Sequence, residues 1–184
     1  MKITELPLNG LYLLEEEPLQ DARGLFSRVF CLNDFNSFNL FRNGISQINR
    51  SLSKEKFTLR GIHFQTKPFQ EAKYVRVKSG SIFDVAIDLR KSSKTFLKWH
   101  AETLSAGDNK GFYLSEGFGH GIMTLEPETE IEYFVSMKYS PNHERGLIWN
   151  DEKLKIEWPA VPSVISDKDQ SWQRLDAWDL NDFE

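Results

Sequence analysis

The chain has 184 residues and is acidic overall, with 23 Lys and Arg against 27 Asp and Glu, which argues against a nucleic-acid-binding protein. Its 40% apolar composition is too high for a disordered chain, and no uncharged run approaches the about 20 apolar residues of a membrane-spanning helix. The single cysteine, Cys31, excludes an internal disulfide and any site built from several thiolates, and without a signal-peptide core we expect a cytoplasmic protein.

Short strands dominate the predicted secondary structure. Apolar alternation of period two predicts strands over residues 10–15, 26–31, 45–53, 59–65, 72–78, 82–89, 98–104, 110–114 and 130–139. The two most regular, 82–89 and 130–139, are each expected to have one buried face. Helical signals are confined to residues 32–41 and to Ser166, an expected N-cap followed by Asp167 and Asp169.

The organisation predicted from these elements is a single all-β domain. No Gly-, Ser- or Pro-rich linker divides the chain, so we expect one domain over residues 1–184, with 173–184 as a C-terminal tail. Many short strands with a few short peripheral helices favour a sandwich or an antiparallel barrel. The mouth of a small barrel can hold one small ligand.

Four polar residues are candidates for chemistry because of where the strand pattern places them, namely His63, Lys73, His120 and Tyr133. His63 lies in a strand-like stretch and could act as a general base, although a hydrogen-bonded core histidine is favoured by its position alone. Lys73 shares strand parity with Val75 and Val77, and an inward ammonium is costly unless it meets an anion. Tyr133 is also expected to point inward, where a tyrosine ordinarily hydrogen-bonds to a carbonyl.

The sequence around the histidines bears on two structural features, a tight turn and a metal site. His120 lies in a Gly-rich stretch that favours a tight turn between strands, with the histidine as a structural turn residue. Small β-barrels often hold a metal with two histidines separated by one residue, but the second position after His63 is Gln65. Without two close histidines and a carboxylate, a tight transition-metal site is disfavoured, and no metal or cofactor is expected.

Eight strings in order give the chain its resemblance to a known family. They are DARGLF (21–26), QINRS (47–51), LRGIHFQ (59–65), EAKYVRVKSGSIFDVAIDLR (71–90), EGFGHG (116–121), YSPNHERGLIWND (139–151), IEWP (156–159) and ISDKD (165–169). Together they resemble the dTDP-4-dehydrorhamnose 3,5-epimerase family over residues 5–172. The resemblance implies a cupin-type antiparallel β-barrel (jelly roll), a homodimer with exchanged strands, no metal, and a nucleotide-linked 4-keto-6-deoxyhexose as substrate.

The resemblance also implies residue roles in an epimerisation. His63 would be the base with Asp169 as its partner, Tyr133 the acid on the opposite face of the sugar, and Lys73 the group that stabilises the enolate oxygen. The implied substrate-binding positions are Arg23, Gln47, Asn49, Arg60, His120, Tyr139, Glu144 and Lys168. Arg23 is expected to reach the diphosphate, in its own subunit or across the dimer. Arg23, Arg60, Lys73 and Lys168 are expected to converge on one barrel mouth despite the net charge of −4.

Departures from the family pattern leave alternatives open. Arg28 stands where the family typically has a glutamate, which bears on the nucleobase and the sugar but not on the chemistry. Inversion of C3, C5 or both is compatible with the residues. A nucleotide-sugar 3,4-ketoisomerase, a metal-dependent cupin oxygenase and a non-catalytic nucleotide-sugar binding module are the competing hypotheses.

Overall fold

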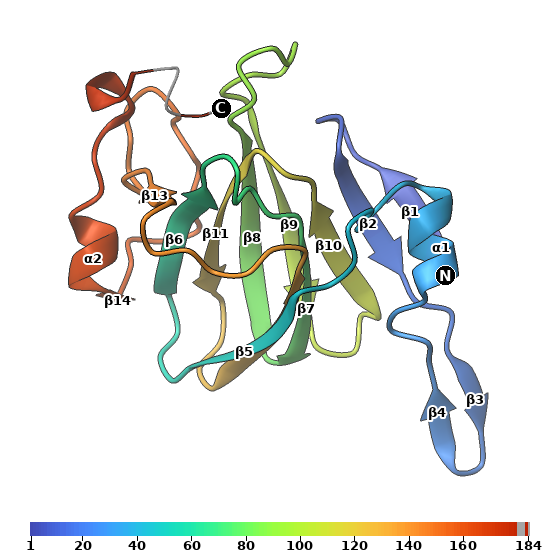
Figure 1. The fold of residues 1–184 in the computed structure, drawn as a ribbon. Helices are drawn as coiled ribbons and strands as arrows, with labels where there is room; N and C mark the ends of the chain where they lie inside the picture. Colours follow the sequence, from blue (N-terminus) through green and yellow to red (C-terminus); the bar gives the residue numbers. More distant parts are fainter. Residues whose placement is uncertain (180–182, 184) are drawn as a thin grey trace.

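The computed structural model describes residues 1–179 and 183, and most of its elements are strands of two facing sheets (Figure 1). The first sheet has the order β1-β2-β10-β7-β12-β5 and the second β13-β6-β11-β8-β9, with β14 paired to β6. The strands are β1 (Lys2–Glu5), β2 (Leu11–Glu15), β3 (Leu19–Asp21), β4 (Gly24–Phe26), β5 (Gln47–Ser53), β6 (Thr58–Gln65), β7 (Lys73–Ser79), β8 (Ser81–Asp88), β9 (Trp99–Ser105), β10 (Lys110–Leu114), β11 (Phe118–Thr124), β12 (Thr129–Val135), β13 (Glu144–Gly146) and β14 (Val164–Ile165).

The helices are short and peripheral, as predicted. They are α1 (Leu32–Ser37), α2 (Asp167–Gln170) and the 3-10 helix η1 (Leu175–Ala177). Ser166 is the N-cap of α2, and its hydroxyl accepts a hydrogen bond from the backbone N–H of Asp169. The all-β, cupin-type fold class is therefore confirmed, with two facing sheets across the described residues in place of one continuously bonded barrel. Within the same residues, no helix is long and apolar enough to span a membrane.

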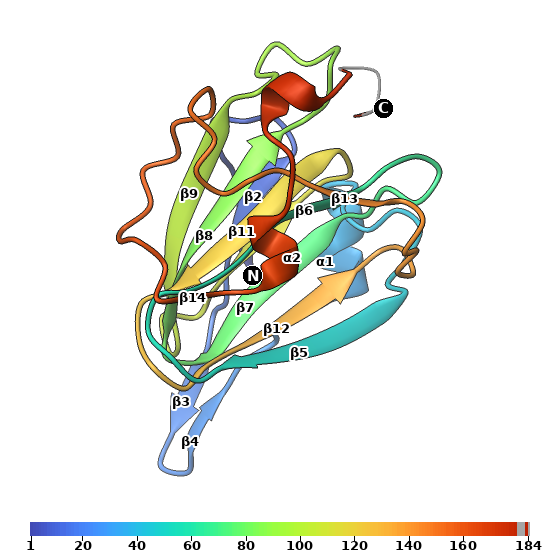
Figure 2. The same cartoon turned by 90° about the vertical axis from the view of Figure 1, so that its left-hand side faces the viewer.

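Among the described residues, three apolar clusters separate four layers. The central cluster lies between the sheets and contains Val75, Ile82 and Phe112. A second lies between the outer face of the β6–β11–β8–β9 sheet and the C-terminal segment, and a third lies between the other sheet and α1. Figure 2 shows α2 and the C-terminal segment in front of the second sheet. Each sheet is thus covered on both faces.

The predicted single buried face of residues 82–89 is wrong for this reason. Ile82 and Ala86 face the central cluster, whereas Val85, Ile87 and Leu89 face the cover provided by the C-terminal segment. Both sets of β8 side chains are buried, and the aspartates among them are buried as well. Part of the expected tail, residues 173–184, belongs to this cover, because Leu175 and Phe183 are buried there; residues 180–182 and 184 lie outside the described residues.

Two local predictions are also wrong. The strand expected over residues 26–31 ends at Phe26, and the following residues lead to α1 so that Phe30 packs against Phe35. The Gly-rich stretch around His120 is strand β11 and not a turn. Its glycines serve close packing, because a side chain at Gly119 would press against Ile62.

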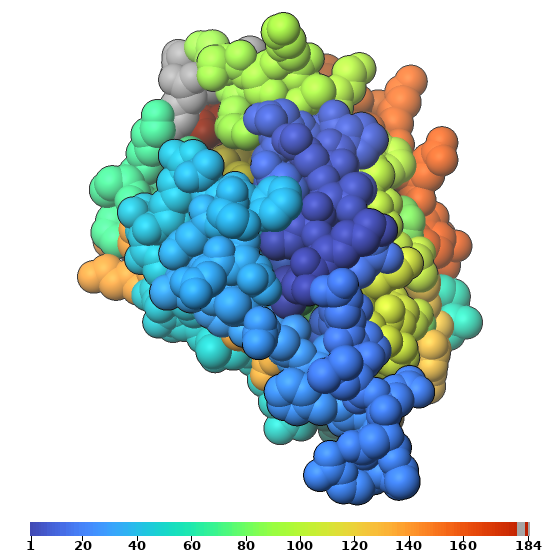
Figure 3. Space-filling view, turned by 90° about the vertical axis from the view of Figure 1, so that its right-hand side faces the viewer, coloured from blue at the N-terminus to red at the C-terminus, as the bar shows by residue number. Residues whose placement is uncertain are grey.

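The β3–β4 hairpin projects from the body of the molecule (Figure 1). Its outer surface carries Leu19, Leu25 and Phe26, which are 72%, 62% and 69% exposed. Figure 3 shows the N-terminal strands and the α1 segment side by side on one face, with the hairpin protruding beyond them. Large apolar side chains on an isolated two-stranded ribbon indicate an interaction surface.

Candidate active site

A two-lobed cleft lies between the two sheets at the end near α2. One lobe, of about 480 Å³, is lined by residues that include Arg60, His120 and Lys168; the other, of about 390 Å³, includes Gln47 and Glu144. Both lobes share three residues: His63, Lys73 and Tyr133. The residues that the sequence placed at the centre of the chemistry therefore meet at the junction of the lobes.

The two sheets contribute different members of this junction. His63 on β6 and His120 on β11 are direct cross-strand partners in one sheet. Lys73 on β7 and Tyr133 on β12 belong to the other sheet, where Tyr133 pairs with Val75, two residues from Lys73. Cross-strand and diagonal neighbours on one face of a sheet lie within side-chain reach of each other. The imidazole and the phenol thus approach the cleft from opposite sides.

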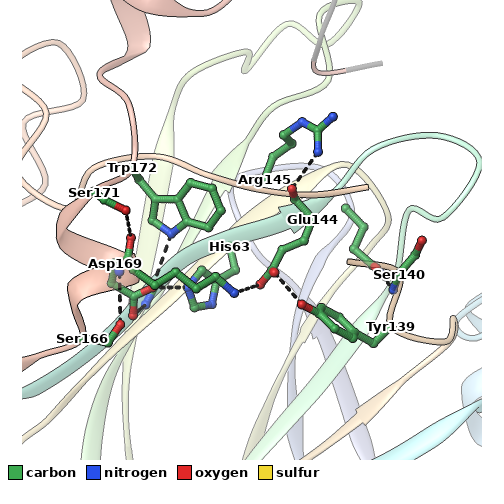
Figure 4. Close-up of polar contacts among 12 residues, drawn as sticks. His63, Tyr139, Ser140, Glu144, Arg145, Ser166, Asp169, Ser171 and Trp172 are labelled. Atoms are coloured by element: carbon green, nitrogen blue, oxygen red, sulfur yellow. Dashed lines mark hydrogen bonds and ion pairs between the residues drawn. The ribbon is translucent and has the colours of Figure 1, made fainter. Parts of the chain in front are cut away.

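His63 is held by a carboxylate from far along the chain. Its Nε2 lies 2.5 Å from Asp169 Oδ1, and Figure 4 shows this contact beside Trp172. If Nε2 carries the proton, it donates to Asp169 and the lone pair is left on Nδ1, the arrangement that a general base requires. The second oxygen of Asp169 accepts a hydrogen bond from the backbone N–H of Gly61 at 3.2 Å.

Gly61 is required where β6 meets β11. Its φ is +126°, and a Cβ at this position would collide with the backbone of Gly121. The register of the two strands shifts between His120 and Ile122, so the ladder is irregular beside His63. This irregularity leaves the N–H of Gly61 free to bond to Asp169 in place of a ladder partner.

The charge state of Asp169 is set by these contacts. Burial acts to raise its pKa, but the hydrogen bond and charge of His63, the N–H of Gly61 and the indole of Trp172 together hold the pKa below the ordinary aspartate value. Asp169 is therefore ionised at neutral pH, and its negative charge stabilises a protonated His63 imidazole.

Lys73 is buried at the junction and has an anionic neighbour. Its Nζ lies 3.1 Å from Glu71 Oε1. Glu71 in turn accepts a hydrogen bond from Gln65 Nε2 at 3.0 Å, and Gln65 also accepts from the backbone N–H of Ser140. The inward lysine that the strand parity predicts is confirmed, and its anion is Glu71. The carboxamide of Gln65 therefore holds Glu71 in place and is fully occupied by hydrogen bonds to other residues of the protein.

His120 has a carboxylate partner that the sequence reasoning missed. Its Nε2 lies 2.7 Å from Asp84 Oδ1, and Asp84 is fully buried. Burial raises the pKa of Asp84, and the nearby His120 and Lys73 oppose that rise. Asp84 belongs to the set of β8 side chains opposite Val85 and Ile87, which faces the central cluster. A signal was present, because Ile82 and Ala86 flank it with the same parity.

A hydrogen-bonded chain crosses the second lobe. Glu144 accepts from Lys168 Nζ at 2.5 Å with one oxygen and from the Tyr139 hydroxyl at 2.7 Å with the other (Figure 4). Burial favours a higher pKa for Glu144, but Lys168 and Tyr139 lower it below the ordinary value. Gln47 accepts from the backbone N–H of Tyr139 and completes this wall. Asn49 lines the same lobe.

Of the four cationic side chains that were predicted to converge on one mouth of the barrel, three do so. Arg60, Lys73 and Lys168 line the large lobe. Arg23 lies at the tip of the β3–β4 hairpin, where its guanidinium forms an ion pair with Asp21 and is 90% exposed. Arg23 is outside the cleft because the hairpin projects away from the sheets (Figure 1). Arg28, the departure noted in the sequence, is exposed just beyond the same hairpin.

The arrangement is suited to moving protons next to a carbonyl. It offers an imidazole oriented by a carboxylate on one side, and on the other side a phenol and a buried ammonium from the opposing sheet. A hydrogen α to a ketone becomes removable when the enolate oxygen is stabilised by a nearby donor or cation. Among the described residues, no group of three or more His, Cys, Asp or Glu is placed to hold a metal ion.

The chain is similar to proteins of one family along almost its whole length. A family model described as dTDP-4-dehydrorhamnose 3,5-epimerase matches residues 5–177. A dTDP-4-dehydrorhamnose 3,5-epimerase from Sinorhizobium fredii is 40% identical over 176 residues, which are 95% of this chain and 90% of the relative.

Solved structures agree with this similarity. A dTDP-4-dehydrorhamnose 3,5-epimerase from Bacillus anthracis with TDP and PPi bound has a TM-score of 0.91 and 37% identity, covering 95% of this chain and 99% of that chain. A dTDP-6-deoxy-D-glucose-3,5-epimerase from Legionella pneumophila, in complex with dTDP-4-keto-L-rhamnose, has a TM-score of 0.92 and 30% identity, covering 98% of this chain and 96% of that chain.

Proposed function

Because the chain belongs to the dTDP-4-dehydrorhamnose 3,5-epimerase family, we propose that it inverts C3 and C5 of a dTDP-linked 4-keto-6-deoxyhexose in the cleft around His63. It is an isomerase of deoxysugar biosynthesis, as its relatives are. The observation that carries the residue assignment is that the imidazole of His63 and the phenol of Tyr133 belong to opposing sheets yet line the same cleft.

The first step is proton removal by His63. The C–H electron pair at the carbon next to the ketone moves into the new C=C bond, the carbonyl π pair moves onto oxygen, and the proton goes to the imidazole. Asp169 lies 2.5 Å from His63 and stabilises the imidazolium that forms. Lys73 supports the enolate oxygen with its ammonium, which is charge stabilisation at the position where charge develops.

The second step is reprotonation from the other face by Tyr133. Collapse of the enolate returns the carbonyl and takes the phenol proton onto carbon, so the configuration inverts and atoms and charge balance. The resulting phenolate and imidazolium must exchange protons before a second carbon reacts. Lys73 lies diagonally across the strands from Tyr133 and favours the transient phenolate electrostatically.

The remaining candidates serve substrate binding. Arg60, His120 and Lys168 line the large lobe, which suits the sugar and part of the diphosphate. Gln47, Asn49, Tyr139 and Glu144 line the polar lobe, which suits the nucleoside. Two relatives hold TDP or a dTDP-linked sugar, which supports a nucleotide sugar as the ligand here.

Proton NMR in deuterated water with dTDP-4-keto-6-deoxyglucose tests this proposal. The C3 and C5 proton signals should disappear when wild-type protein is added, because each abstracted proton is replaced from solvent. A His63→Ala variant should lose at least about 100-fold of this exchange rate. Wild-type exchange no faster than that of the variant would overturn the proposal, and tight binding without exchange would favour a non-catalytic binding module.

The Tyr133→Phe variant separates the two steps. Proton removal by His63 does not need the phenol, so exchange at C3 should continue. Inversion should fall about 100-fold, because the donor on the opposite face is missing. Equal losses of exchange and inversion would show that Tyr133 does not act as the acid.

We further propose that the protein works as a homodimer in which the β3–β4 hairpin docks on a second copy. The hairpin exposes Leu19, Leu25 and Phe26 and presents unpaired strand edges. Strand β5 forms the outer edge of its sheet and exposes Ile48, so it offers a complementary edge on the second copy. Docking there would carry Arg23 toward the partner's cleft, where Asn49 of the same strand β5 lies.

A further inference from the structure

The indole of Trp172 lies against the pair formed by His63 and Asp169. Trp172 follows α2 at a distance of two residues from its last residue, Gln170. Its Nε1 donates to Asp169 Oδ1 at 3.3 Å, the same oxygen that contacts His63 (Figure 4). The indole and imidazole ring centroids are 6.2 Å apart with an interplanar angle of 68°, an edge-to-face arrangement. One side chain therefore touches both members of the pair.

Strand β13, which neighbours β6, has a glycine where the indole ring of Trp172 packs against it. Gly146 on β13 is the cross-strand partner of His63, and a Cβ at Gly146 would overlap the indole of Trp172. The absence of a side chain at Gly146 thus allows the ring to pack directly against β13. The indole is half-buried between β13 and α2, which restricts the directions in which its N–H can point.

The face of the same ring meets a cation of the site. The Nζ of Lys168 lies 5.6 Å from the ring centroid of Trp172 while it forms an ion pair with Glu144. An ammonium over an indole face is favoured electrostatically. Trp172 therefore contacts the His63–Asp169 pair through its N–H and Lys168 through the face of its ring.

We propose that Trp172 is a positioning residue for the epimerisation, which orients Asp169 through its indole N–H and supports Lys168 through its ring. This inference rests on the proposed function, because it assigns Trp172 a part in the step that His63 performs. Asp169 comes from a helix of only four residues, which holds its backbone weakly. A donor fixed by tight packing compensates for that short helix by defining where Oδ1 lies.

The N–H of Trp172 also helps to keep Asp169 ionised. Burial raises the pKa of this carboxyl, and the hydrogen bonds from His63, Gly61 and Trp172 oppose that rise. Loss of the indole N–H should move the pKa of Asp169 upward, so the carboxylate would become protonated at a higher pH. A more basic Asp169 also stabilises a protonated His63 imidazole more strongly, so the acid limb of the rate profile should move to higher pH as well.

The Trp172→Phe variant tests the role of the N–H because it keeps a ring over Lys168. We expect kcat to fall about tenfold, KM to change less than about twofold, and the acid limb of kcat to move to higher pH. Trp172→Leu removes the ring face as well and should also raise KM. Gly146→Ala, which displaces the ring without changing it, should reproduce the loss of kcat.

Trp99→Phe is the matched control. Trp99 Nε1 donates to the backbone carbonyl of Leu154 at 3.0 Å, outside the cleft, so this variant should lose stability without moving the acid limb. In an Asp169→Asn background, Trp172→Phe should have little further effect on kcat, because both changes act on one carboxylate.

The outcomes distinguish this inference from the proposed function. Wild-type protein that exchanges no deuterium contradicts the proposed function itself. Wild-type exchange with an unchanged kcat and acid limb in Trp172→Phe overturns the role of Trp172 alone. A loss of kcat that Trp99→Phe shares, with no movement of the acid limb, would reduce Trp172 to a structural residue.

Discussion

Buried aspartates in this chain differ in how many donors surround them. Asp169 accepts from His63, Gly61 and Trp172, and its pKa is lowered although burial opposes this. Asp84 is bonded through one oxygen to His120, and its other oxygen has no hydrogen-bond partner among the described residues. Burial consequently dominates at Asp84, and its pKa is raised. Asp84 is both more deeply buried and less well supplied with donors than Asp169, and these two differences together leave Asp169 charged and raise the pKa of Asp84.

Replacing Asp84 by asparagine should separate stability from activity. A carboxyl with a raised folded pKa stabilises the fold below its unfolded value, and that contribution is lost as pH rises through the folded pKa. Asp84→Asn should therefore match or exceed the Tm of the wild type, with an advantage that grows as pH rises above 3.8, the ordinary aspartate value. Activity should fall about tenfold, because His120 loses its anionic partner.

Thermal unfolding between acidic and neutral pH, with kcat measured on the same samples, provides the test for Asp84. A variant with a Tm several degrees lower and with unchanged kcat would show that the carboxylate is a structural group. Asp176→Asn serves as a control, since Asp176 is an exposed partner of Lys153 and should change neither quantity.

Individual site residues were predictable where strand parity or a family string applied to them. Lys73 and Tyr133 share the parity of apolar neighbours, so their inward direction follows from period two alone. Trp172 and Glu71 were missed, because their contacts depend on which segments meet in three dimensions. The N-cap at Ser166 was predicted from local sequence, but nothing local shows that α2 lies beside β6.

At the scale of elements, the connection from β8 to β9 is organised by one carboxylate. Asp88 Oδ1 accepts from the backbone N–H and Nε of Arg90, and Oδ2 accepts from Arg90 Nη2 and from the hydroxyls of Ser93 and Thr95. Burial opposes ionisation, but these donors lower the pKa of Asp88. The sequence shows only a charged turn, whereas the structure shows a turn built around a buried anion.

Asp88→Asn should destabilise the protein by about 2 kcal/mol without changing the exchange activity. An amide nitrogen cannot accept from Ser93 and Thr95, and the charge opposite Arg90 is lost. Because the folded pKa is depressed, this stabilisation is present above the unfolded pKa and is lost as pH falls through the folded value. Urea unfolding at neutral and acidic pH should show a difference from wild type that shrinks in acid. An equal difference at both pH values would contradict this account.

The elements predicted best were those with regular alternation. β2, β5, β6, β7, β8, β9 and β10 lie where the apolar pattern places them, and β12 begins as expected but ends at Val135. β1, β3, β11, β13 and β14 were not predicted, and β4 overlaps the strand expected over residues 26–31 only at Phe26. β13 and β14 are three and two residues long and are defined by their pairing with β6. Such short segments contain too few residues for an apolar alternation to predict a strand.

At the scale of the whole molecule, the site depends on long-range folding. His63 and Asp169 are 106 residues apart in the chain, and the segment that carries Asp169 also covers the outer face of the second sheet. The net charge of −4 likewise conceals a local pattern, because Arg60, Lys73 and Lys168 line one lobe while Glu71 and Glu144 hold two of those cations. The overall composition indicates neither that the C-terminal segment covers the second sheet nor that these charges gather in one cleft. The family strings predicted the cations of the cleft, but they did not show that Arg23 lies outside the cleft of its own chain.

The position of Arg23 leads to a prediction about the assembled molecule. If the β3–β4 hairpin docks on a second copy, each cleft contains His63 of its own subunit and Arg23 of the other. Arg23→Ala should then lower kcat/KM about tenfold or more, because a guanidinium can bind a diphosphate bidentately. Leu25→Asp combined with Phe26→Asp should convert the dimer to a monomer, as light scattering during size-exclusion chromatography would show.

Mixing two impaired variants decides whether the cleft is shared between subunits. In a heterodimer of Arg23→Ala and His63→Ala chains, one cleft combines an intact His63 with an intact Arg23 from the other subunit, and the second cleft lacks both. Random reassociation after unfolding and refolding an equal mixture should restore about a quarter of the wild-type exchange rate, since half of the dimers hold one intact site of two. If Arg23 served its own cleft, no heterodimer would contain a better site than the Arg23→Ala homodimer. The mixture would then never exceed the mean of its two components, and the exchanged-hairpin arrangement would be wrong.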